Sequence, residues 1–216
     1  MSIPAAAKLL TVFERLFATY GKPECPLAFG SMFQLLTAVT LSAQTTDKAV
    51  NAVTEVLFAS YGTAEAMAAA SEEEVGKIIR PIGLFRNKSK NLVAAARMIC
   101  RDFAGEVPPT MAELVRLPGV GRKSANVILG VGFGTPGFPA DTHVQRLLIR
   151  LGIVDRRDPL LAERVVCENL APEYWTDFSH LLIQHGRAVC SAGKPRCGNC
   201  QLTDLCEYYG GENGRA

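Results

Sequence analysis

Apolar residues recur every three or four positions along most of this 216-residue chain, which is the spacing of one face of a helix. The first such segment runs from Leu9 to Phe17, and Gly21 with Pro23 closes it. Residues 31–43 are mostly apolar over a length that exceeds a typical strand, so we expect a buried helix there. The alternation that is typical of strands is lacking. The pattern therefore predicts an all-α fold.

Local signals set several helix ends. The helix that contains Val50 and Leu57 should end at Gly62. Ser71 followed by Glu74 is a capping-box pattern ahead of a new helix. After the break at Pro81 and Gly83, further helices are expected over residues 88–103, 110–116, 122–130, 142–151, 159–170 and 173–189.

Composition narrows the class of protein. With 48% hydrophobic and 20% charged residues, the chain can bury a core, which excludes a disordered protein. No apolar run is long enough to cross a membrane. The first thirty residues contain Glu14 and Glu24 and no cleavage pattern behind a basic start, so we expect no export signal. The net charge of +2 neither requires nor excludes a nucleic-acid partner.

Basic residues are unevenly distributed. Between Lys77 and Arg101 the chain has seven basic residues and no acidic one, and Arg187, Lys194 and Arg196 lie in another stretch without acids. Such stretches can form a face that meets phosphates. They can equally form a solvated helix face that acids from elsewhere balance, and the run alone does not decide between the two.

Four of the seven cysteines crowd into seventeen positions near the end of the chain: Cys190, Cys197, Cys200 and Cys206. An odd total without an export signal favours reduced thiols in a cytosolic compartment. The cluster therefore indicates a metal site, and its spacing fits either zinc or an iron–sulfur cluster. Cys25, Cys100 and Cys167 are expected to be small buried side chains.

A glycine hairpin lies in the middle of the chain. Pro118 ends one helix, and Gly119 and Gly121 flank Val120 just before the next. Glycine lets the backbone approach a ligand closely, and outward amides at a helix start can hold one DNA backbone phosphate without reading sequence. A plain helix–helix turn is the alternative for a Gly-x-Gly pattern.

Several segments together resemble the endonuclease III family of DNA glycosylases. LPGVGRKSANVILGVGFG followed by PADTHVQRLLIRLG is similar to that family's helix-hairpin-helix and Gly/Pro…Asp signature. The spacing Cys-x₆-Cys-x₂-Cys-x₅-Cys matches the family's [4Fe–4S] loop. LSAQTTDKAVN at 41–51 and IGLFRNKSKN at 82–91 also resemble family segments, so the likeness runs from about residue 27 to 209.

The resemblance implies a monomeric, bifunctional DNA glycosylase and abasic-site lyase of the bacterial cytoplasm and nucleoid. Its substrate would be double-stranded DNA with an oxidised pyrimidine, of the thymine glycol type, or an abasic site. Lys123 would attack C1′ of a flipped-out nucleotide, expel the base and form a Schiff base, and β-elimination would then cut the strand. Asp141 would stabilise positive charge at C1′ and help to move a proton. A surface lysine and a simple N-cap aspartate are the alternative interpretations.

The amine of Lys123 must be uncharged to attack. Its neighbour Arg122, the helix start and partial burial would favour the uncharged form.

The resemblance also implies DNA contacts. Gln44 and Leu84 would fill the space that the extruded nucleotide leaves; otherwise they would be a polar helix-end residue and a core leucine. Further contacts are expected from Gly119, Val120, Gly121, Arg122, His143, Lys194 and Arg196.

The implied architecture has two helical domains. Residues 25–135 would form a six-helix domain with the helix-hairpin-helix motif. Residues 1–24 plus 136–216 would form the domain with the C-terminal [4Fe–4S] cluster loop. The active cleft would lie between the two domains, with Lys123 and Asp141 on opposite walls.

Three other functions compete with this hypothesis. The adenine-mismatch glycosylases need a catalytic glutamate before their glutamine-rich segment, and residues 27–46 contain no carboxylate. They lack the hairpin lysine and usually carry an added C-terminal domain, for which little chain follows Cys206. Thymine-mismatch enzymes are excluded less firmly, although they too typically replace the lysine. A non-catalytic hairpin or zinc module would form no covalent adduct with abasic DNA.

Overall fold

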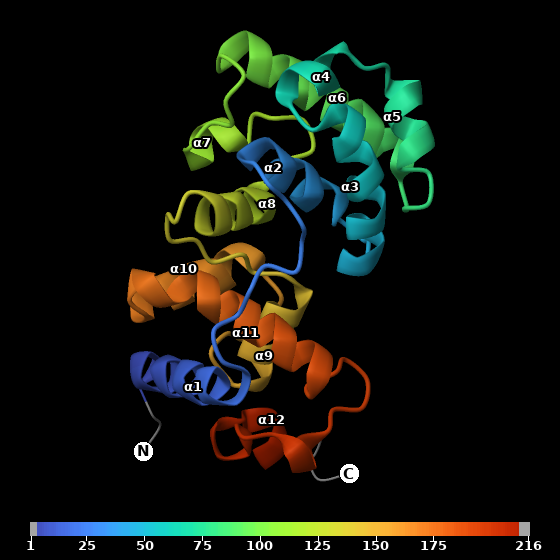
Figure 1. Cartoon of the computed structure of the whole chain (residues 1–216). Coiled ribbons are helices and arrows are strands. Elements are labelled where there is room, and N and C mark those ends of the chain that lie inside the picture. Colours follow the sequence, from blue (N-terminus) through green and yellow to red (C-terminus); the bar gives the residue numbers. More distant parts are fainter. Residues whose placement is uncertain (1–3, 212–216) are drawn as a thin grey trace. The chain divides into compact units, whose positions relative to one another are not determined.

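The computed structural model describes residues 4–211 as helices joined by turns and loops, and it contains no strand within that range (Figure 1). This confirms the all-α fold. None of the helices in the described range is long and apolar enough to cross a membrane. The described residues fall into two compact units. One belongs to Met1–Glu24 and Pro136–Ala216, and the other is Cys25–Thr135.

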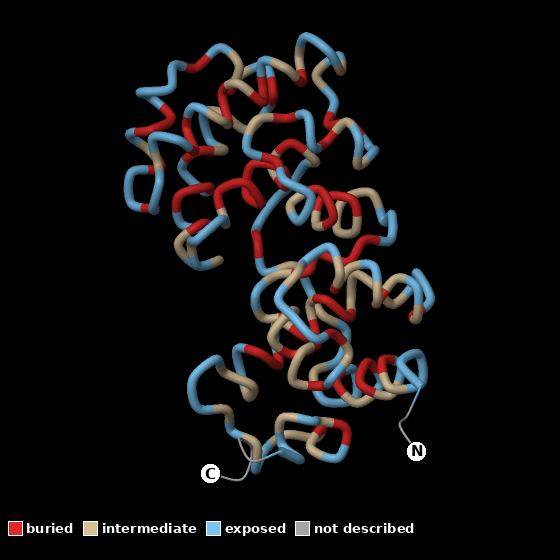
Figure 2. The backbone as a smooth tube through the Cα atoms, turned by 180° about the vertical axis from the view of Figure 1, so that it is seen from behind, coloured by how far each residue is buried: buried red, intermediate tan, exposed pale blue. Residues whose placement is uncertain are grey.

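The unit Cys25–Thr135 is built around one apolar helix. Its elements are α2 (Met32–Leu41), α3 (Asp47–Tyr61), α4 (Ala64–Ala69), α5 (Glu72–Ile78), α6 (Phe85–Asp102), α7 (Met111–Leu114), α8 (Arg122–Val127) and the π-helix η1 (Ile128–Gly132). Eight of the ten residues of α2 are buried, which confirms the expected buried helix. Each unit has its own buried segments, drawn red in Figure 2.

Hydroxyl side chains begin most helices of this unit. Ser71 and Glu74 form the predicted capping box, in which each side chain accepts a hydrogen bond from the other residue's backbone N–H. Thr46 caps α3 in the same manner, through a bond from the N–H of Ala49. The short helix α4 was not predicted, because its sequence is largely alanine and shows no spaced apolar face; only Ala64 and Met67 are buried.

Three predicted helix ranges need correction. The helix expected over 88–103 begins at Phe85, because Leu84 turns the backbone into the helix. The helix expected over 110–116 is the short α7. The one expected over 122–130 changes to a π-helix at Ile128. A Cβ at Gly132 would lie 2.7 Å from the sulfur of Met32 and 2.8 Å from Leu35 Cδ2, so this glycine lets η1 pack tightly on α2.

The other unit consists of α1 (Ala5–Tyr20), α9 (Thr142–Arg150), α10 (Pro159–Asn169), α11 (Trp175–Ala188), α12 (Glu207–Gly210) and short 3₁₀ turns at Pro172–Tyr174, Cys197–Asn199 and Thr203–Leu205. Its core is partly aromatic, since the ring of Phe178 lies 6.1 Å from Phe13 and 6.0 Å from Phe138. Burial of these large side chains supplies much of the hydrophobic stabilisation. The helix α1 therefore packs with C-terminal helices rather than with the chain that follows it.

Candidate active site and cysteine loop

The glycine hairpin joins α7 to α8. Gly119 adopts a left-handed backbone with φ of 82°. Val120 is buried, and its N–H donates to the carbonyl of Leu117 at 3.0 Å. Gly119 and Gly121 are exposed. The turn therefore presents its two glycines to the surface and holds Val120 inward.

The two glycines have different surroundings. A Cβ at Gly119 would lie 3.0 Å from Asn91 Cβ on α6 and 3.2 Å from Thr40 Cγ2 on α2. A Cβ at Gly121 would meet no atom within 4 Å. Gly119 thus lets the hairpin pack against α2 and α6, while Gly121 leaves open space in front of the backbone.

This contrast predicts the effects of two alanine substitutions. Gly119→Ala should lower the free energy of unfolding by about 2–4 kcal/mol, because the left-handed backbone and the overpacking both disfavour a side chain. Gly121→Ala, at an N-cap with extended backbone, should cost less than about 1 kcal/mol. Urea unfolding of both variants measures the difference. Equal stabilities would show that the hairpin does not depend on its close packing.

Lys123 is the second residue of α8 and is exposed. The expected partial burial is therefore wrong, because the hairpin places this first turn at the surface of its unit.

Asp141 is the N-cap of α9, as the alternative interpretation proposed. Its Oδ1 accepts hydrogen bonds from the N–H of His143 at 2.8 Å and from the N–H of Val144 at 3.0 Å. The residue is half-buried. The cap thus fixes the carboxylate at the start of α9, in the unit that does not contain Lys123.

His143 is oriented by a partner one helical turn further on. Nη2 of Arg146 lies 3.0 Å from Nδ1 of His143. Arginine can only donate, so Nδ1 accepts and a neutral ring carries its proton on Nε2. Burial lowers the pKa of His143, which favours that neutral ring.

The four clustered cysteines line one pocket. Its wall is formed by Arg150, Val189, Cys190, Pro195, Cys197, Cys200, Thr203, Cys206, Tyr208 and Tyr209. Burial raises the pKa of Cys200 and of Cys206, and the charges of the other clustered thiols raise both further. In the described part of the chain, no three His, Cys, Asp or Glu side chains lie together as ligands for a single metal ion. The four thiols thus share the wall of one pocket.

Two arginines of α9 hold the cysteine loop. Arg150 donates to Sγ of Cys190 at 3.0 Å and to the carbonyl of Ser191 at 2.8 Å. Arg146 donates to the carbonyl of Cys190 at 2.9 Å. Neither role could be predicted from local sequence patterns, because about forty residues separate these partners.

His185 also has a place that the sequence did not predict. It is buried in α11, with Nδ1 2.9 Å from the hydroxyl of Tyr20 and Nε2 3.4 Å from Sγ of Cys200. Burial lowers its pKa to about 4, so the ring is neutral at pH 7. The neutral ring thus contacts a clustered thiol from the core of its unit.

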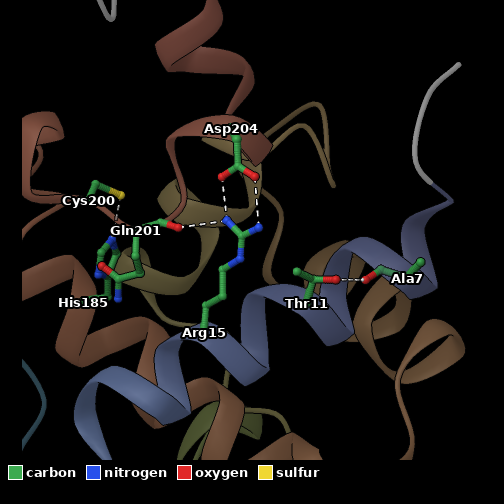
Figure 3. A network of polar contacts seen from close by, with 7 residues as sticks. All are labelled: Ala7, Thr11, Arg15, His185, Cys200, Gln201 and Asp204. Atoms are coloured by element: carbon green, nitrogen blue, oxygen red, sulfur yellow. Dashed lines mark hydrogen bonds and ion pairs between the residues drawn. The ribbon is translucent and has the colours of Figure 1, made fainter.

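The helix α1 is tied to the same loop, as Figure 3 shows. The guanidinium of Arg15 binds both carboxylate oxygens of Asp204, with Nη2 to Oδ2 at 2.9 Å, and donates to the carbonyl of Gln201 at 3.0 Å. A bidentate pair of this kind restricts both partners. The cysteine loop is therefore anchored at Cys190 and Ser191 from α9 and between Cys200 and Cys206 from α1.

Gln44 and Leu84 share an unusual backbone. Of the described residues, only Gln44, Leu84 and Ala104 are non-glycine residues with positive φ, at 53°, 59° and 54°. Such conformations cost of order 1 kcal/mol or more and persist where the surroundings enforce them. Gln44 is exposed, and Leu84 is 56% exposed. The alternative interpretation of Leu84 as a core leucine is thus wrong.

The basic run 77–101 is only partly available to a ligand. Lys77 pairs with Glu73 at 2.8 Å, Arg101 pairs with Asp102, and Lys88 is buried. Arg80, Arg86 and Lys90 are exposed. Both interpretations of the run therefore hold in part.

Comparisons with known proteins agree with the predicted helix-hairpin-helix motif and with the all-α fold. Residues 37–172 match the model of the HhH-GPD superfamily of base excision DNA repair proteins. The chain is 46% identical to an endonuclease III of Synechocystis over 202 residues, which covers 93% of this chain and 91% of the relative. The chain belongs to the endonuclease III family.

Further similarities place this endonuclease III family member among enzymes. It is 46% identical to an endonuclease III of Bacillus subtilis over 85% of this chain and 84% of the relative. A solved structure of a trapped endonuclease III–DNA covalent intermediate matches 95% of this chain and 97% of that chain, with a TM-score of 0.90 and 38% identity. The protein is accordingly a bifunctional DNA glycosylase and abasic-site lyase of base excision repair.

Proposed function

We propose that Lys123 and Asp141 carry this activity on double-stranded DNA that contains an oxidised pyrimidine or an abasic site. The observation that carries the proposal is the exposed position of Lys123 at the start of the helix behind the glycine hairpin, in a chain similar to an endonuclease III that forms a covalent intermediate with DNA. We expect the protein to act in the cytoplasm, at the bacterial nucleoid.

The proposed chemistry begins with the neutral amine of Lys123. Its lone pair attacks C1′ of an extruded nucleotide, and the glycosidic bond breaks as the base leaves with the bonding electrons and takes up a proton. Loss of the second amine proton and opening of the sugar ring give an imine. The imine acidifies the 2′ protons, so removal of one expels the 3′ phosphate and cuts the strand. Water then releases the lysine.

Asp141 acts on the charge that develops at the sugar. A carboxylate near C1′ stabilises the positive charge that appears as the base departs. The two N–H groups that bind Oδ1 hold the carboxylate in one orientation. The same residue can carry a proton from the lysine amine to the leaving base.

The proposed DNA interface combines a wedge with phosphate contacts. The exposed Gln44 and Leu84 would enter the duplex in place of the extruded nucleotide. Gly119, Gly121 and Arg122 would bind backbone phosphate at the hairpin, while Val120 supports the turn from inside. His143 would donate from Nε2, and the exposed Lys194 and Arg196 would bind phosphate from the cysteine loop.

The clustered cysteines are proposed to hold a [4Fe–4S] cluster. Cys190, Cys197, Cys200 and Cys206 fit this group because all four thiols line one pocket and cysteine thiolates are the ligands such clusters require. When bound, the cluster cross-links the loop that carries Lys194 and Arg196. Glycosidic cleavage and elimination need no electron transfer, so its role in this reaction is structural.

Iron content tests the cluster directly. The purified protein should be yellow-brown and contain about four irons per chain. Cys197→Ala should lose the iron and the colour, whereas Cys167→Ala, at another half-buried cysteine, should retain both. Elemental analysis and absorbance spectra measure these properties. A colourless wild-type protein loaded with zinc would overturn the assignment.

A panel of defined duplexes tests the proposed substrate. The protein should excise thymine glycol and other oxidised pyrimidines and cut the strand at the resulting abasic site. It should leave adenine or thymine in a mismatch intact. Base release from a mismatch without strand cleavage would favour a monofunctional mismatch glycosylase, and binding without base release would favour a non-catalytic module.

A further inference from the structure

A buried lysine connects the two loops that carry Gln44 and Leu84. Lys88 lies one turn into α6 and is 5% exposed. Its Nζ donates to the carbonyl of Leu41 at 2.9 Å and to the hydroxyl of Thr45 at 2.8 Å. Lysines are rarely buried unless their charge is bound, and burial lowers the pKa of this amine. Burial of a charged amine costs free energy, so we expect the hydrogen bonds of Lys88 to have a function.

One end of the link is the Gln44 loop. Leu41 is the last residue of α2, so its carbonyl has no partner within the helix. Thr45 accepts from Lys88, and its hydroxyl also lies 3.2 Å from the carbonyl of Ala43. The ammonium therefore binds both sides of the short segment that contains Gln44. These bonds oppose relaxation of its left-handed backbone.

The other end of the link is the Leu84 turn. The backbone N–H of Lys88 donates to the carbonyl of Leu84 at 3.0 Å, which closes the first turn of α6 behind a second left-handed residue. Lys88 thus binds the Leu84 turn through its main chain and the Gln44 loop through its side chain. Both bonded segments lie in the same compact unit.

We propose that Lys88 is a positioning residue that holds Gln44 and Leu84 at a fixed spacing, so that both side chains can enter the duplex while the damaged nucleotide is extruded. The inference rests on the proposed role of these two side chains in DNA. Lys88 itself is buried and does not touch the substrate in this account. It acts by keeping two exposed, strained loop residues at a fixed spacing before DNA binds. The extrusion step then no longer has to order these two residues, which lowers its free-energy cost.

The test compares two substrates that differ only in the cost of extrusion. One is a fully paired duplex with an oxidised pyrimidine, and the other carries the same lesion inside a short unpaired bubble. Lys88→Met keeps the length of the side chain and removes its donors. We expect single-turnover excision from the paired duplex to fall about 10- to 100-fold, with little change on the bubble. Lys77→Met, at an exposed lysine paired with Glu73, should leave both rates unchanged.

A second pair of variants covers the case in which Lys88→Met does not fold. Thr45→Val removes one acceptor of the ammonium and keeps the shape of the side chain, while Thr45→Ser keeps the hydroxyl. Thr45→Val should slow excision from the paired duplex selectively, and Thr45→Ser should restore the wild-type ratio of the two rates. Melting temperatures of all variants confirm that the folded protein is measured.

The possible results separate this inference from the proposed function. If the wild-type protein excises the lesion from neither substrate, the proposed function fails and the inference fails with it. If the wild-type protein is active but the folded Lys88 and Thr45 variants lose or retain activity equally on both substrates, the positioning role alone is overturned.

Discussion

Lys123→Gln is expected to abolish covalent trapping on abasic DNA and to lower strand cleavage by at least about 10⁴-fold, on the scale seen when an enzyme loses its nucleophile. Glutamine keeps a polar side chain at an exposed position, so the fold and much of the DNA affinity should survive. It has no amine, so no imine can form and borohydride has nothing to reduce. Gel electrophoresis after borohydride treatment measures the trapped complex.

Lys48 supplies a matched control for this substitution. It is also an exposed lysine at the second position of a helix, in α3. Lys48→Gln should leave trapping intact. If Lys123→Gln is still trapped, another amine is the nucleophile and the central assignment is wrong.

Asp141→Asn is expected to slow base release by about 10²- to 10³-fold, the range for loss of one group that stabilises the transition state electrostatically. Asparagine caps helices about as well as aspartate, so α9 should keep its start and the protein its stability. The variant loses only the negative charge and the ability to carry a proton. Single-turnover release of an oxidised pyrimidine measures the effect, with DNA affinity determined in parallel.

A second N-cap aspartate separates capping from catalysis. Asp158 begins α10 by accepting from the N–H groups of Leu160 and Leu161, both at 3.0 Å. Asp158→Asn therefore makes the same chemical change at the same kind of position and should leave turnover unchanged. Equal turnover of Asp141→Asn and the wild-type protein would reduce Asp141 to a structural cap.

The helices were predictable because their apolar residues recur at a fixed spacing and their first residues carry recognisable caps. Ser71 with Glu74 illustrates this, since the whole box lies within four residues. The helix α4 was not predicted, because its alanine residues form no spaced pattern of large apolar side chains. The π-helix at Ile128 depends on how Gly132 packs against Met32 and Leu35, which local spacing does not reveal.

In the candidate site, too, some features could be predicted from the sequence and others could not. Asp141 is recognisable as a cap from the residues beside it, and the hairpin from its two glycines. The exposure of Lys123 depends on how its unit folds, and the expected partial burial was wrong. Lys88 and Thr45 lie 43 residues apart, and Arg150 and Cys190 lie 40 apart. Contacts between residues so distant in the chain are set by tertiary packing, so periodicity and capping patterns contain no information about them.

The most direct test of the account is to locate the covalent bond. The wild-type protein is incubated with duplex DNA that contains an oxidised pyrimidine, reduced with borohydride and digested, and the peptide that carries the sugar is sequenced by mass spectrometry. We expect one modified residue, Lys123, with the mass of a reduced sugar on its amine. A sugar on any other lysine, or no sugar adduct on a protein that still cuts the strand, would contradict the proposed mechanism.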